Sequence, residues 1–143
     1  MPTPAEIKKA LITAGFEVYQ TRGDVVHVAE RVRENLLMDS GVRVESRSPK
    51  VGFVVRAQRN DFPSDGEDAL FARARTLAGP AAERGYTEVA SQVTQVTDPG
   101  DSARTLDTWC EVSFEKPVES VDVAMDEVRF ALGLEKAVTR AAH

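Results

Sequence analysis

The chain has 143 residues, of which 42% are hydrophobic and 29% charged, and its formal net charge at pH 7 is -5. Such a composition is typical of one globular domain with a buried core. The negative charge argues against nucleic acid or an anionic membrane as the main partner, because binding to phosphate groups requires a basic surface.

The N-terminal half is predicted to form a helix followed by several strands. Thr3 is a typical N-cap, Glu6 completes a capping box with it, and Gly15 is a typical helix end. The segment 29–40 fits a helix face and a strand equally well, and the strand-like residues after it favour a strand. The strands expected here are residues 16–21 and 24–29, joined by a turn at Arg22-Gly23, and then residues 42–45 and 51–58.

The C-terminal half is predicted to contain two further helices and two strands. Ser64 and Glu67 form a second capping box, and Gly79-Pro80 is expected to kink or split the helix that begins there. Residues 98–103 are expected to be a turn or an exposed loop. The strands are expected at residues 87–97 and 105–116, and the last helix at residues 118–137, with Gly133 as an alternative end.

This order predicts the α+β class, with residues 1–143 forming a single two-layer domain. We expect a mostly antiparallel sheet of five or six strands, with about three helices mainly on one face. The order helix, strands, helix, two strands, helix is similar in architecture to that of the type III secretion chaperone class. That resemblance implies a dimer that binds unfolded segments of client proteins along exposed apolar surfaces, and no residue role is carried over from it.

Residues 106–114, LDTWCEVSF, alternate between two faces of an extended chain. One face, which includes Cys110, is expected to be core. The other carries Asp107, Trp109 and Glu111, and Trp109 is the only tryptophan of the chain. Three explanations stay open for Trp109: the chain itself covers it, it belongs to a partner or self-association surface, or it is a platform for a small ligand between the two carboxylates.

The last predicted helix has an unusually wide apolar surface. One side carries apolar residues such as Val128, and a different flank carries Phe130 and Leu134. A helix that only covers a sheet needs a narrower apolar stripe. Either this helix packs on two elements of its own domain or it contributes to a dimer, so Phe130 and Leu134 are candidate interface residues.

The sequence offers little for catalysis. His27 is the only histidine apart from His143 and is expected to be a surface strand residue, while Cys110 is expected to be a buried, inert thiol. No metal-binding or phosphate-binding motif occurs. We therefore expect no catalytic residues, no metal and no cofactor.

A modest basic region spans residues 31–59, with Arg31, Arg33, Arg43 and Arg47 as its candidate residues. It is either an ordinary solvated face or a contact for an anionic partner, nucleic acid being the less favoured choice for an acidic protein.

Together these features predict a non-enzymatic protein-binding domain, adaptor-like or chaperone-like and homodimeric, that acts through the last helix and the Trp109 face of the sheet. One alternative is a small-molecule-binding protein or hydrolase-like enzyme with a pocket at Trp109, Asp107 and Glu111. The other is nucleic-acid binding through Arg31–Arg59. No segment is apolar for long enough to span a membrane, and the first residues lack the apolar run of a signal peptide, so we expect a cytoplasmic protein without a membrane partner.

Overall fold

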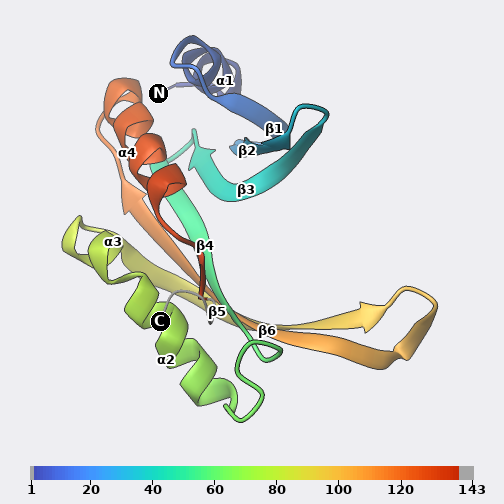
Figure 1. Cartoon of the computed structure of the whole chain (residues 1–143). Helices are drawn as coiled ribbons and strands as arrows, with labels where there is room; N and C mark the ends of the chain where they lie inside the picture. The colour runs from blue at the N-terminus through green and yellow to red at the C-terminus, as the bar shows by residue number, and fades with distance from the viewer. Residues whose placement is uncertain (1, 139–143) are drawn as a thin grey trace. The chain divides into compact units, whose positions relative to one another are not determined.

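A computed structural model of the protein describes residues 2–138 (Figure 1). The elements in chain order are α1 (Pro4–Thr13), β1 (Glu17–Arg22), β2 (Val25–Arg33), β3 (Leu36–Glu45), β4 (Lys50–Gln58), α2 (Glu67–Leu77), α3 (Gly79–Glu83), β5 (Thr87–Asp98), β6 (Asp101–Pro117), α4 (Val121–Gly133) and β7 (Ala137–Val138). The hydrogen-bonded strand order is β1-β2-β3-β4-β6-β5, and β7 pairs in parallel with β4. The predicted α+β class with a mostly antiparallel sheet is confirmed.

The described residues form two compact units. The first contains residues 2–53 and 115–134, and the second contains residues 54–114 and 135–138. β4 and β6 therefore contribute residues to both units. The assignment of residues 1–143 to one domain stays a prediction.

In the first unit, α1 begins as its sequence predicts. The backbone N–H of Glu6 donates to Thr3 Oγ1 over 3.2 Å, which satisfies one of the free donors at the start of the helix. Gly15 follows the helix with φ 93, a conformation that favours glycine. Ile7 and Leu11 are buried on the inner side of the helix.

The first strands form hairpins, and this resolves the ambiguous segment 29–40. It lies in β2 and β3, which are antiparallel, so the strand interpretation is confirmed. The first turn is one residue later than expected, because Arg22 pairs with Val25 and the turn is Gly23-Asp24. Gly23 occupies the first turn position with a φ of 57°, a positive value that glycine adopts without strain.

The last helix, α4, is shorter than predicted and ends at Gly133, the alternative end. Residues 137–138 form β7 instead of a last helical turn. Within the first unit α4 packs against both β3 and α1, and its inward residues Met125 and Val128 are buried. Its wide apolar surface is thus used on two elements of its own unit.

In the second unit, α2 does not begin at the predicted capping box. Its N-cap is Gly66, which makes no side-chain cap hydrogen bond. The residues before it continue a turn, since the N–H of Asp65 donates to the carbonyl of Phe62 and the Asp65 carboxylate holds Arg73 at 2.6 Å. The predicted split at Gly79-Pro80 is confirmed, because α2 ends at Leu77 and α3 begins at Gly79.

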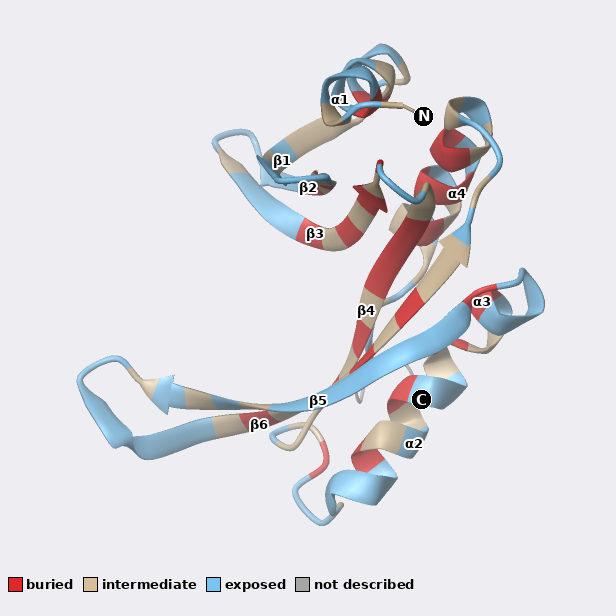
Figure 2. Cartoon of the chain, turned by 180° about the vertical axis from the view of Figure 1, so that it is seen from behind, coloured by how far each residue is buried: buried red, intermediate tan, exposed pale blue. Residues whose placement is uncertain are grey.

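β5 and β6 form a long hairpin whose turn is Pro99-Gly100. β6 already begins at Asp101, so most of the predicted loop 98–103 is strand. The end of this hairpin extends past α2 and α3 in Figure 1, and β5 is almost entirely exposed in Figure 2. On β6 the predicted alternation is confirmed, with Cys110 and Val112 fully buried.

Candidate functional site

Trp109 lies on β6, half-buried, on the strand face opposite to Cys110. The guanidinium carbon of Arg56, on β4, lies 3.9 Å from the centre of the indole ring. The indole N–H donates to Asp107 Oδ2 over 2.9 Å. The ring is therefore held by a cation on its face and by a carboxylate at its edge, a geometry that favours attraction between guanidinium and ring.

Glu111 lies on the same strand face, with a side chain that is 12% exposed, compared with 35% for Arg56. Its Oε1 accepts hydrogen bonds from Thr94 Oγ1 at 2.6 Å and from Gln92 Nε2 at 3.3 Å, both on β5. Its Oε2 lies 3.8 Å from Arg56 Nε, which is an ion pair rather than a hydrogen bond. Arg56 is consequently positioned by charge and by the indole ring together.

Asp107 anchors the end of β4 to β6. Its Oδ1 accepts the backbone N–H of Thr108 at 2.7 Å and that of Asn60 at 3.1 Å. The Asn60 side chain also donates to the carbonyl of Leu106 over 3.1 Å. We call Arg56, Asp107, Trp109 and Glu111 the Trp109 cluster.

Both carboxylates of the Trp109 cluster are engaged by other groups of the protein. Asp107 accepts hydrogen bonds from two backbone N–H groups and the indole, and Glu111 accepts them from Thr94 and Gln92. Arg56 covers one face of the indole ring. Its side chain is 35% exposed, although its Nε is buried, and Trp109 is half-buried, so part of the cluster stays open to contact.

The nucleophile and base considered from the sequence belong to different units. Burial raises the pKa of the Cys110 thiol, and the nearby Glu67 carboxylate adds to this effect. The thiol therefore stays protonated and inaccessible. His27 points away from the buried Val26 and Val28, with Nδ1 3.7 Å from Asp39 Oδ2. Among residues 2–138, no three His, Cys, Asp or Glu side chains gather as they would around a metal ion.

The arginines of the basic region do not lie together as one open patch. Arg31 forms a bidentate ion pair with Glu17, in which both nitrogen–oxygen distances are 2.9 Å. Arg43 lies 3.5 Å from Glu115. Arg33 and Arg47 are exposed.

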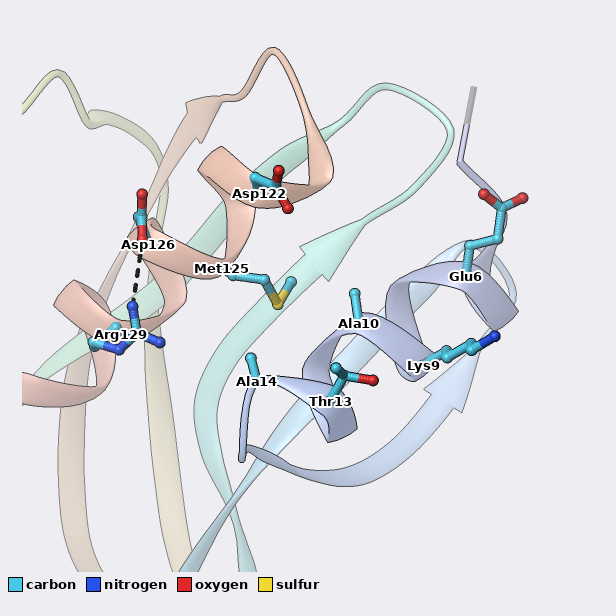
Figure 3. A pocket seen from close by; sticks show the side chains of 9 residues that line it. All are labelled: Glu6, Lys9, Ala10, Thr13, Ala14, Asp122, Met125, Asp126 and Arg129. Carbon is cyan, nitrogen blue, oxygen red and sulfur yellow. Dashed lines mark hydrogen bonds and ion pairs between the residues drawn. The ribbon is translucent and has the colours of Figure 1, made fainter.

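A groove of about 570 Å³ lies between α1 and α4 in the first unit (Figure 3). Met125 points into it from α4, Lys9 lines it from α1, and Arg129 binds Asp126 at 3.3 Å on its rim. The sequence did not predict this groove, because the groove depends on how α1, near the start of the sequence, packs against α4, near its end. Two candidate residues, Phe130 on α4 and Leu134 directly after the helix, are half-buried and are not among the residues that line the groove.

Sequence reasoning grouped Asp107, Trp109 and Glu111 correctly on one face of one strand. It missed Arg56, Thr94 and Gln92, which complete the surface. Arg56 alternates with the buried Val55 and Ala57, so its outward face could have been inferred. The strand order β4-β6-β5, which places Arg56 next to Trp109, could not have been inferred from the sequence.

Comparisons with protein-family models, with curated proteins and with solved structures found no match. Within residues 2–138 no helix has both the length and the apolar character needed to cross a membrane.

Proposed function

We propose that this protein is a non-enzymatic protein-binding domain whose binding surface is centred on the Trp109 cluster. The observation that carries the proposal is the stack of Arg56 on Trp109, with 3.9 Å between the guanidinium carbon and the ring centre. Tryptophan and arginine are the residue types most enriched at the energetic centres of protein interfaces. Here the two types lie in direct contact on a partly exposed strand face.

The surrounding contacts favour this role because a hydrogen bond restrains Trp109 and an ion pair restrains Arg56 before a partner arrives. Asp107 holds the indole at its edge, and Glu111 holds the guanidinium. Side chains that are ordered in advance lose less conformational entropy when a complex forms. A polypeptide with carbonyl or carboxylate oxygens facing Arg56 and apolar groups facing the indole would match this surface.

The expected role is that of an adaptor-like or chaperone-like protein in the cytoplasm, in keeping with the single, buried cysteine. The participation of the last helix, through Phe130 and Leu134, stays a prediction. Neither alternative function is adopted. Arg56 already covers one face of the indole, which leaves less of the ring for a stacked ligand, and Arg31 and Arg43 are paired with carboxylates.

A selection of displayed random peptides against the full chain tests the proposal. We expect selected peptides to lose at least about tenfold in affinity for Trp109→Ala and for Arg56→Ala, as at interface hot spots. The matched control is Tyr19→Ala, which removes a 45% exposed aromatic side chain from β1. Circular dichroism confirms that each variant is folded. Peptides that bind Trp109→Ala as tightly as the parent chain, or that lose as much affinity for Tyr19→Ala, would refute the assignment.

A further inference from the structure

We propose that the outer edge of β5 pairs antiparallel with β5 of a second copy of this chain, so that two sheets join around a two-fold axis. β5 is the last strand in the hydrogen-bonded order, with β6 as its neighbour on one side and no strand of residues 2–138 on the other. Along such an edge, backbone N–H and C=O groups point outward without strand partners, which makes it a template for another strand.

The composition of β5 leaves this edge unprotected. The strand is 12 residues long, and its interior, residues 89–97, contains no charged residue, no proline and no glycine. Its threonines and valines favour extended structure. Sheet proteins often guard their edges with charges, proline or a short strand, and the interior of this 12-residue strand offers none of these protections.

The opposite edge strand of the same sheet shows the contrast. β1 is six residues long, carries Glu17 and Arg22, and has a register irregularity between Val18 and Gln20. Arg31 from the neighbouring strand also forms an ion pair with Glu17. The edge formed by β1 is thus protected by its short length and its charges, while the interior of β5 is long and uncharged.

A second copy is the occupant that fits the side chains of β5. An antiparallel pairing centred on Val93 sets the Val93 side chains of the two copies opposite each other and Val89 opposite Thr97. Val89 is 51% exposed and Val93 38% exposed, so pairing removes apolar surface from water. Opposed β-branched side chains are among the pairs that stabilise antiparallel strands.

The charges at the ends of β5 are compatible with the same register. It brings Glu88 of one copy close to Asp98 of the other, and like charges in such positions normally destabilise a sheet. Here Glu88 is paired with Arg75, with Nε 2.8 Å from Oε1, and Asp98 lies 3.7 Å from Arg104. Each end of the paired strands would therefore hold the Arg75–Glu88 pair of one copy and the Arg104–Asp98 pair of the other, so that the two negative charges are matched by two positive charges.

Sedimentation equilibrium on the full chain tests this pairing. We expect the mass of a dimer for the parent chain and of a monomer for Val93→Lys at the same concentration, because the substitution sets two ammonium groups opposite each other. The matched control is Val32→Lys, at a 51% exposed valine of β2, which is expected to stay dimeric. A parent chain that is monomeric at every concentration, or a Val93→Lys variant that stays dimeric, overturns the proposal.

Should Val93→Lys fail to fold, as judged by circular dichroism, Val93→Cys decides the question. Residues opposite each other across paired strands lie within the range of a disulfide, so mild oxidation is expected to link two chains. Val89→Cys serves as the control, since its side chain would face Thr97 and lie far from its counterpart. Failure of Val93→Cys to form the linked dimer, or equal linking through Val89→Cys, rejects the pairing.

Discussion

Arg43 of β3 and Glu115 of β6 form an ion pair across the intervening strand, with 3.5 Å between Nη2 and Oε1. The pair passes over Gly52 of β4. A Cβ at position 52 would lie 2.9 Å from Arg43 Cζ and 3.1 Å from Glu115 Cγ, so the glycine leaves the room that the two side chains use. The open face of the first unit is therefore a layer of paired charges, with Lys50 adding contacts of 3.5 Å to both Glu45 and Glu115.

The first prediction concerns Gly52. Gly52→Ala is expected to lower the free energy of unfolding by about 1 kcal/mol, because the added methyl group displaces the ion pair. In an Arg43→Ala background the same change is expected to cost less, since the closest contact is removed and only the 3.1 Å approach to Glu115 Cγ remains, while alanine suits a strand better than glycine. Urea denaturation of the four chains gives the coupling energy. A coupling energy of zero would show that the close approach has no effect.

The second prediction concerns Asp107. Asp107→Ala is expected to cost about 1–3 kcal/mol of unfolding free energy, because it removes the acceptor for the indole N–H and for two backbone N–H groups. Trp109 is the only tryptophan, so its fluorescence also reports the change directly. Glu119→Ala, at an exposed carboxylate, serves as the control and is expected to be neutral within about 0.5 kcal/mol. Equal stability of the two variants would contradict the anchoring role.

The third prediction concerns the pH dependence of the Arg75–Glu88 pair. The hydrogen bond and charge of Arg75 lower the pKa of Glu88 below its ordinary value, despite some opposing burial. A carboxylate whose pKa is lower when folded stabilises the fold above its unfolded pKa, and this contribution is lost as the pH falls through the folded pKa. NMR titration is expected to show the Glu88 pKa rising in Arg75→Gln. An unchanged Glu88 pKa in that variant would mean that the pair does not form in solution.

The fourth prediction concerns the reactivity of Cys110. Its side chain is fully buried, and burial raises the pKa of the thiol. We expect no reaction with an aromatic disulfide reagent under native conditions and complete reaction in denaturant. Ser102→Cys places a thiol on the exposed part of the β5–β6 hairpin and is expected to react at once. Rapid native reaction of Cys110 in the parent chain would contradict its placement in the core.

Much of the local structure could be predicted because it is encoded by neighbouring residues. The start of α1 follows from Thr3 and Glu6, and the two faces of β6 follow from strict alternation around Cys110 and Trp109. The helix start predicted from the second capping box was wrong, because residues up to Asp65 form a turn and α2 begins only at Glu67. The ion pair that Asp65 forms with Arg73, which lies within α2 itself, is not apparent from the capping motif alone.

The alternation of residues along β6 was enough to place Asp107, Trp109 and Glu111 on one strand face. The contact of Arg56 with the indole, the hydrogen bonds of Thr94 and Gln92 to Glu111, and the edge position of β5 emerged from the folded chain. The physical reason is that the side-chain period of a strand is a local property, whereas strand order depends on long-range hydrogen bonds between distant segments.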